Sequence, residues 1–309
     1  MRYAYVTFLM RNDSYLPGAL VLAYALKMQT NLDCVCLVTE NISKSACHAL
    51  HVLYDKVITT DELKFENVVK GGRSDRKNLP TRFQALRLCE NGGLGAAYDK
   101  IILLDADVLP LHNYDALFAL NTPAGIIMEN KTACYSSGIQ DSAKWSWHAL
   151  YEPTCPHGLK IPYALTDRVR TDPLNMGVNS GLWVLRPSMD EFNEVSEAMN
   201  NPEILNLLEK FPWPEMQLAT LLWSGRWTNV DIRYCSIGGY PKPDVLFGMH
   251  FAGVKPWQIK HRSITHYARF PDFLLWYEFF NAMYWSHSEL REISSLKKIC
   301  EFINPRLRI

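Results

Sequence analysis

Short apolar runs alternate with segments of helical periodicity through the first third of the chain. The runs predict buried strands at 3–8, 35–39, 56–59 and 101–104. The segments between them predict helices at 14–28, 43–54 and 81–90, the first capped by Asp13 or Ser14 and the last closed by Gly92 and Gly93. Strands that alternate with helices form βαβ units, so we predict an α/β fold with a mostly parallel central sheet.

The pattern is less regular in the second half. Further strands are predicted at 124–128 and 178–185, and helices within 188–208 and at 214–223. Residues 129–175 carry aromatic side chains among Pro, Gly, Ser and Thr, and we interpret them as an insertion. This insertion is either a lid over a site or a surface excursion whose tryptophans fill a small core of their own. The chain is predicted to form a single domain over 1–309, with a helical tail at 286–309.

Composition narrows the classes of function. The chain has 309 residues, 48% of them hydrophobic, and its 32 basic side chains balance 32 acidic ones. A net charge of zero gives no long-range field to hold nucleic acid or an anionic membrane. No apolar stretch is long enough to span a membrane, and charged residues interrupt the N-terminal run, which is unlike a signal peptide. We therefore expect a cytoplasmic globular protein whose eight cysteines are reduced thiols.

Two aspartates directly follow the buried strand at 101–104. Asp105 and Asp107 are separated by the small residue Ala106, so both carboxylates can converge on one hard divalent cation in a turn. The carboxyl ends of strands are also where α/β sheets place their sites. Aspartate is common at solvated strand ends as well, and the pattern alone leaves both interpretations open.

A second candidate group lies at 250–257. His250, Gly253 and Lys255 fall within six residues and can supply a metal ligand, a phosphate-binding amide and a phosphate-binding cation. A lone histidine is more often structural. Together with the two aspartates, however, His250 makes an oxygen and nitrogen ligand set that suits Mn²⁺.

Three further stretches fit the same kind of site. Asn12 can hydrogen-bond a ligand beyond the first strand, and Tyr15 offers a stacking face for a base. Arg73 and Arg82 can clamp phosphates. The 179–181 segment combines an amide side chain with a glycine where another group packs closely. Each stretch has a structural alternative, namely helix capping, a solvated loop and core packing.

Taken in order along the chain, these motifs resemble the glycogenin-like family of glycosyltransferases, glycosyltransferase family 8. The resemblance covers residues 3–285 and rests on 12–15, 18–22, 105–107, 179–181, Gln217, 250–253 and 255–257. It implies a GT-A fold, a donor site for a UDP-sugar that depends on Mn²⁺ or another divalent cation, and transfer with retention at the anomeric carbon.

The resemblance also implies roles for individual residues. Those expected to hold the metal are Asp105, Asp107 and His250. Those expected to line the rest of the donor site are Phe8, Leu9, Asn12, Tyr15, Arg73, Arg82, Ala106, Asn179, Ser180, Gln217, Gly253 and Lys255. Those expected to serve the chemistry are Lys255, Gln217, Glu215 and Asn179.

The predicted function is therefore a retaining, metal-dependent transfer of a hexose, with glucose as the first candidate, from a UDP-sugar to a hydroxyl group. The acceptor is a glycan, a protein or a small molecule, and a homodimer is a candidate assembly. Retention favours same-face attack, and Glu215 is the acid to test as a nucleophile. Tyr240 is the tyrosine nearest to the position that glycogenin glucosylates on itself.

Two other functions stay open. A sugar-nucleotide nucleotidyltransferase also combines an α/β sheet with acidic metal ligands, but the glycine-rich phosphate loop after its first strand is missing here. A catalytically silent protein that binds UDP-sugar or glycan is the other alternative, because Met216 stands where the family has an aspartate.

Overall fold

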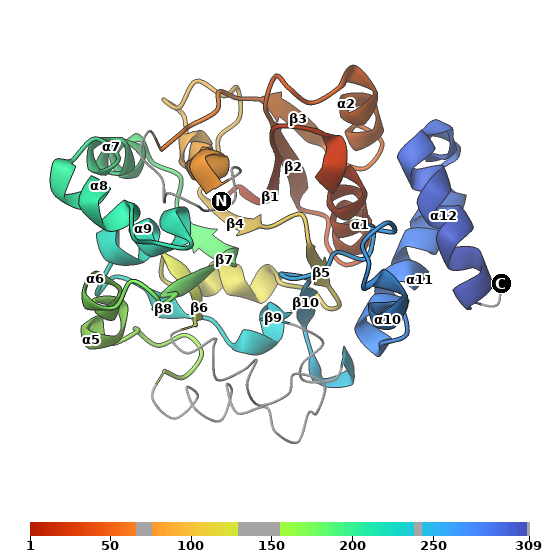
Figure 1. The fold of residues 1–309 in the computed structure, drawn as a ribbon. Coiled ribbons are helices and arrows are strands. Elements are labelled where there is room, and N and C mark those ends of the chain that lie inside the picture. The colour runs from red at the N-terminus through yellow and green to blue at the C-terminus, as the bar shows by residue number, and fades with distance from the viewer. Residues whose placement is uncertain (66–75, 129–154, 238–242, 308–309) are drawn as a thin grey trace.

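The computed structural model describes residues 1–65, 76–128, 155–237 and 243–307. In these residues, the central sheet has seven strands in the order β3-β2-β1-β4-β7-β6-β8 (Figure 1). All neighbouring strands are parallel except where β7 pairs with β4 and β6, which confirms the α/β fold and the mostly parallel sheet. The strands are β1 (Tyr3–Leu9), β2 (Asp33–Val38), β3 (Lys56–Thr59), β4 (Lys100–Leu104), β6 (Ala124–Ile127), β7 (Val178–Leu185) and β8 (Thr228–Asn229).

Two hydrophobic cores lie on opposite faces of this sheet because side chains alternate along each strand. Tyr5 belongs to one core, and its neighbours Ala4 and Val6 belong to the other. Figure 1 shows which helices cover each face. On the first face lie α1 (Leu16–Lys27), α2 (Lys44–Leu50), α11 (Pro271–Ser286) and α12 (Ser294–Leu307), and on the second lie α7 (Met189–Ala198), α8 (Pro202–Leu208) and α9 (Pro214–Leu222).

The first predicted helix begins later than its apolar pattern suggested. A single 3₁₀ turn, η1 (Asp13–Tyr15), precedes α1, and Asn12 caps it by accepting a hydrogen bond from Ser14 N at 2.9 Å. The predicted cap at Asp13 or Ser14 was therefore wrong by one or two residues. Pro17 lies in the first turn of α1, where its missing N–H removes no hydrogen bond of the helix.

Two other predicted helices differ in type or number. The segment expected as an α-helix at 81–90 is a 3₁₀ helix, η2 (Arg76–Arg87), with Pro80 inside it. Proline removes a backbone donor and clashes with the preceding turn, so a regular α-helix is disfavoured there. The helical region within 188–208 is divided into α7 and α8, because Asn201 and Pro202 start a new helix by capping it.

A second, smaller sheet lies beyond the carboxyl end of β4. In the described residues it contains β5 (Val108–Pro110), β10 (Gly248–His250) and β9 (Ser236–Ile237), with β10 in the middle. Strand β10 runs antiparallel to β5, and His250 stands directly opposite Val108. The small sheet therefore carries the second candidate motif to the end of the strand that holds the two aspartates.

The described part of the predicted insertion is packed against the second core. Residues 155–175 contain α5 (Tyr163–Thr166) and α6 (Arg168–Thr171), and Cys155, Ile161 and Val169 are buried. Ile161 N donates to Trp227 O at 2.8 Å, next to β8. Residues 129–154 lie outside the described part of the chain, so the lid stays a prediction.

The C-terminal residues form the outer layer of the first face. After α11, a short 3₁₀ helix, η7 (Ser288–Glu292), leads into α12, which packs against α11. Leu296, Ile299 and Ile303 of α12 are buried in the first core. Every cysteine that the structure describes is a free thiol, and Cys134 lies outside that part. In the same described ranges, no helix combines the length and the apolar character that crossing a bilayer requires.

The carboxyl group of Asp272, in the first turn of α11, makes stability depend on pH. It is buried, and burial raises the pKa of Asp272 to about 6. Because the folded pKa exceeds that of the unfolded chain, the native state binds the proton more tightly, and stability falls as the pH rises from about 4 to above 6. Asp272→Asn should therefore raise the free energy of unfolding by on the order of 2 kcal/mol at pH 8 and change it little at pH 4.

Urea titrations at the two pH values measure this difference. Asp190→Asn is the matched control, since Asp190 is also an aspartate in the first turn of a helix but is exposed. An equal effect of Asp272→Asn at pH 4 and pH 8 would contradict the burial argument.

Candidate active site

Main-chain hydrogen bonds fix the loop that carries the two aspartates. Asp105 N donates to Gly181 O of β7 at 3.1 Å, and Val108 N closes the turn onto Asp105 O at 3.0 Å. Phe251 N, just after β10, donates to Asp107 O at 2.9 Å. The loop is thus attached to β7 on one side and to the His250 strand on the other.

These attachments bring Asp105, Asp107 and His250 together. His250 Nε2 lies 3.3 Å from Asp107 Oδ1 and 3.8 Å from Asp105 Oδ2, and one candidate ligand atom from each residue lies within 4.8 Å of the others. Asp107 Oδ1 is buried and has no hydrogen-bond partner in the described residues. Two carboxylates and an imidazole with an unsatisfied oxygen fit a divalent cation such as Mn²⁺.

Gly181 leaves space for the His250 ring. A Cβ atom built on Gly181 would lie 2.6 Å from both Cε1 and Nδ1 of His250. The sequence indicated that some group packs closely against this glycine, and the structure identifies that group as the imidazole. The 179–181 segment therefore helps to form the candidate ligand set, because Gly181 has no side chain that would displace the His250 ring.

Arg82 is used to hold Asp105. Its Nη2 donates to Asp105 Oδ1 at 2.6 Å, and its Nη1 donates to Ser180 O at 2.7 Å. The guanidinium lies 5.0 Å from the centre of the Phe8 ring and 5.2 Å from that of Trp183. With 2% of the residue exposed, Arg82 is a fixed support for the aspartate.

Lys255 is the second cation of the site. Its Nζ contacts Asp107 Oδ2 and donates to Phe251 O at 2.5 Å. Although burial disfavours the charged ammonium, the contact with Asp107 raises the pKa of Lys255. The ammonium also lies 5.7 Å from the centre of the Tyr15 ring, and Lys255 N donates to Gln258 Oε1 at 3.2 Å.

The carboxyl groups of the site differ in their acidity. Burial opposes ionisation of Asp107, but Lys255 and His250 outweigh it and hold the pKa of that carboxyl well below its usual range. Burial raises the pKa of Asp105, although the charge of Arg82 opposes the shift. Burial also raises the pKa of Glu215, and Arg82 again opposes it. One carboxylate is thus firmly ionised, and the other two share one arginine.

A cavity of about 330 Å³ opens in front of the aspartates. It is lined by residues from the end of β1 and the turn that follows, from η2 and from the aspartate loop. Those predicted to bind the donor are Phe8, Asn12, Tyr15, Arg82, Asp105, Ala106 and Asp107, and the others are Met10, Arg11, Ser14, Leu79 and Gln258. The first seven were found from motifs, whereas nothing in the sequence marked the other five.

Arg11 is the least expected of these residues. It has a left-handed backbone, with φ of 70°, and is the single non-glycine residue with positive φ in the described ranges. Such a conformation is uncommon outside glycine, asparagine and aspartate, and it often occurs at binding sites. It turns the chain between Met10 and Asn12 at the edge of the cavity.

Other predicted donor residues do not line this cavity in the described structure. Leu9 lies in the first core, and its carbonyl oxygen accepts from Thr39 N. Asn179 Oδ1 accepts from Gly181 N at 2.7 Å. Gly253 has open space beside it, since a Cβ there would meet nothing within 4 Å. Arg73 and Tyr240 lie outside the described residues.

Gln217 is held by the main chain around α9. Its Oε1 accepts from Trp213 N at 3.0 Å, and its Nε2 donates to Pro173 O at 2.7 Å and to Asn175 O at 2.8 Å. Its neighbour Met216 is buried in the first core. In this structure Gln217 ties the end of the predicted insertion to α9, and its contact with the sugar stays a prediction.

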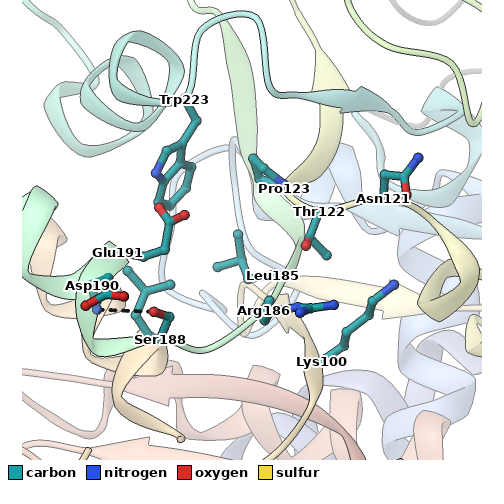
Figure 2. Close-up of a pocket in the computed structure, with 11 residues that line it drawn as sticks. Lys100, Asn121, Thr122, Pro123, Leu185, Arg186, Ser188, Asp190, Glu191 and Trp223 are labelled. Atoms are coloured by element: carbon teal, nitrogen blue, oxygen red, sulfur yellow. Dashed lines mark hydrogen bonds between the residues drawn. The ribbon is translucent and has the colours of Figure 1, made fainter.

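A larger cavity, of about 470 Å³, lies at the opposite end of β4 (Figure 2). Lys100 and Arg186 stand on one side of it, and Asp190, Glu191 and Trp223 on the other. In the parts of the chain that the structure describes, the one cluster of three potential metal ligands is at Asp105, Asp107 and His250. The smaller cavity is therefore the candidate reaction site.

Comparisons with known proteins concern the chain as a whole. No protein-family model matches the chain. The uncharacterized protein R707 of Acanthamoeba polyphaga mimivirus is 29% identical over 266 residues, which are 82% of each chain. Human glycogenin-1 is 26% identical and covers 97% of this chain and 77% of its own length. UDP-glucuronate:xylan alpha-glucuronosyltransferase 1 of Arabidopsis thaliana is 24% identical over 83% of this chain and 32% of its own length.

Solved structures share the fold. The galactosyltransferase LgtC, in complex with donor and acceptor sugar analogs, has a TM-score of 0.58 at 14% identity and covers 90% of this chain and 95% of its own. The bifunctional glycosyltransferase WbbM has a TM-score of 0.57 at 14% identity, over 97% of this chain and 51% of its own. The fold and these relatives define the chain as a glycosyltransferase with the GT-A fold. More particularly, its sequence is similar to that of human glycogenin-1 over nearly the whole chain.

Gly181→Ala tests how the site is assembled. The added methyl group must displace the His250 ring, so the free energy of unfolding should fall by about 1–3 kcal/mol and the imidazole should change its surroundings. Urea titration measures the first effect, and NMR signals of the histidine rings measure the second. For stability, Gly253→Ala is the matched control, since its methyl group has free space. Unchanged stability together with unchanged His250 signals would contradict the predicted clash.

Proposed function

We propose that this glycosyltransferase moves a hexose from a UDP-sugar to a hydroxyl acceptor, with retention at the anomeric carbon and with help from a divalent cation. Glucose is the first candidate for the sugar, because the sequence motifs resemble glycogenin. The observation that carries the proposal is the meeting of Asp105, Asp107 and His250 beside a cavity that also contains Asn12 and Tyr15. One end of this cavity suits a metal with its diphosphate, and the other suits a base.

The candidate ligands fit Mn²⁺ in number and kind. Asp105, Asp107 and His250 would supply two oxygen ligands and one nitrogen ligand, and the unpartnered Asp107 Oδ1 is the buried atom that most needs a cation. When bound there, the cation neutralises diphosphate charge and stabilises the negative charge that develops on the UDP leaving oxygen.

The side chains of the protein have separate tasks in this proposal. Tyr15 stacks on the uracil ring, and Lys255 binds the diphosphate and favours the anionic leaving group. Arg82 keeps Asp105 oriented from behind, because both of its terminal nitrogens are already hydrogen-bonded. We therefore assign Arg82 a positioning role in place of the direct phosphate clamp that the sequence suggested.

Glu215 is poorly placed to be a nucleophile. It is 3% exposed, its Oε1 accepts from Ser180 Oγ at 3.4 Å, and it is not among the residues that line the cavity. These properties favour same-face attack, in which the leaving phosphate oxygen accepts the proton of the acceptor hydroxyl.

A silent UDP-sugar-binding protein is the second candidate function. The observation behind it is Met216, which is part of the apolar core and gives the site no carboxylate where the family has one. Release of hexose from a UDP-sugar separates the two functions, since a binding protein would bind the donor without turning it over. A screen of UDP-glucose, UDP-galactose, UDP-glucuronate and UDP-xylose with Mn²⁺ tests both proposals and identifies the donor.

Asp107→Asn tests the metal-dependent donor site. Removing this carboxylate charge weakens binding of the metal that compensates the diphosphate. UDP affinity in the presence of Mn²⁺ should therefore fall by on the order of 100-fold, and turnover should be lost. Titration calorimetry with UDP, with Mn²⁺ and with excess chelator, measures the effect. Asp33→Asn is the matched control, because Asp33 also pairs with a lysine, Lys56, but lies elsewhere. Equal UDP affinity of the native protein in Mn²⁺ and in chelator would refute the proposal.

A further inference from the structure

Lys255 is paired with one of the two carboxylate oxygens of Asp107, a residue expected to hold a cation. Its Nζ contacts Asp107 Oδ2, so of the two carboxylate oxygens one is paired with an ammonium and the other faces His250 Nε2 at 3.3 Å. The Lys255 and Asp107 side chains are each only 7% exposed. An ion pair this well enclosed interacts strongly, because little water screens it.

The charges of the two aspartates are balanced as the site stands. Asp105 is paired with Arg82 and Asp107 with Lys255, so two carboxylates face two cations. A divalent cation that entered alone would leave two uncompensated positive charges in a mostly buried place. A diphosphate that entered alone would leave two negative ones. If both enter together, the net charge of the site does not change, and the free-energy cost of burying charge in a low dielectric is smallest.

We propose that Lys255 is a stand-in cation, which holds Asp107 against a free divalent ion and transfers to the diphosphate when nucleotide and metal bind together. The inference rests on the function proposed above and adds a binding order to it. Gly253, two residues before Lys255, has open space beside it, because nothing lies within 4 Å of a Cβ there. Among the described residues, the lysine ammonium makes two polar contacts, with Asp107 Oδ2 and with Phe251 O.

The proposal requires that Mn²⁺ and UDP bind cooperatively. In the native protein, Mn²⁺ alone must separate Asp107 from Lys255 without offering the ammonium another anionic partner, so its affinity is expected to be low. With UDP present the ammonium gains a new anionic partner, and Mn²⁺ affinity should rise by on the order of tenfold or more. By reciprocity, Mn²⁺ should raise the affinity for UDP by the same factor.

Replacing Lys255 should change the two affinities in opposite directions. In Lys255→Met, Mn²⁺ alone should bind on the order of tenfold more tightly, since Asp107 is free, whereas UDP in saturating Mn²⁺ should bind on the order of tenfold more weakly. Lys255→Arg keeps the charge and should keep Mn²⁺ binding weak in the absence of UDP. Lys27→Met is the matched control, because it removes a lysine from an ion pair with Asp55 elsewhere and should change neither affinity.

The measurement is MnCl₂ titration of the full chain, with and without UDP, followed by the electron paramagnetic resonance signal of free Mn²⁺. If Lys255→Met does not fold, the native protein still decides the question, since equal Mn²⁺ affinity with and without UDP would overturn the stand-in role. Because the two affinities are linked, UDP binding that does not depend on metal would refute both the proposed function and the stand-in role. Unchanged Mn²⁺ affinity in Lys255→Met, with UDP binding still dependent on metal, would overturn the stand-in role alone.

Discussion

The pairing of β10 with β5 is the contact on which the candidate site depends. The short strand β10 carries His250 to a position opposite Val108, one residue beyond Asp107. Main-chain hydrogen bonds then extend this pairing through Phe251 N to Asp107 O. Ligands that are far apart in sequence are therefore held by a backbone ladder, whose geometry does not depend on the rotamers of flexible side chains.

A mostly buried cluster of charges has to be balanced locally, and this requirement explains the supports around the ladder. Arg82 lies between two aromatic rings and forms an ion pair with Asp105, and Lys255 forms an ion pair with Asp107. Each of the two aspartates has a cation beside it, which favours the ionised form of its carboxyl group. Under the proposed function, a site built in this way suits a metal together with a diphosphate, whose charges cancel, better than either one alone.

The sequence predicted those parts of the fold that local patterns control. Continuous apolar runs identified the strands, and the aspartates were found because they follow such a run directly. Other features escaped the sequence pattern. Pro80 makes η2 a 3₁₀ helix where an α-helix was predicted, and the cap at Asn12 belongs to a turn that has no apolar pattern. Register in the small sheet could not be predicted, because strands of two or three residues carry almost no periodicity.

The candidate site divides in the same way. Asp105, Asp107, His250 and Lys255 were recognisable as residue types at a given spacing, whereas the engagement of Gln217 with the main chain depends on where residues 173–175 pass. The left-handed backbone of Arg11 has no signature in its side chain. Sequence thus indicates which groups can do chemistry, and tertiary packing decides which of them are free to do it.

One contact joins three segments that belong to different parts of the proposed site. A Cβ at Gly18 would lie 2.3 Å from Ala106 O and 2.4 Å from the Trp257 ring, and the Trp257 indole donates to Ser14 O at 2.8 Å. The start of α1, the aspartate loop and the Lys255 segment therefore meet with no space to spare. Positions 18 and 257 are consequently expected to change together during evolution, because a larger residue at position 18 requires a smaller or shifted ring at position 257.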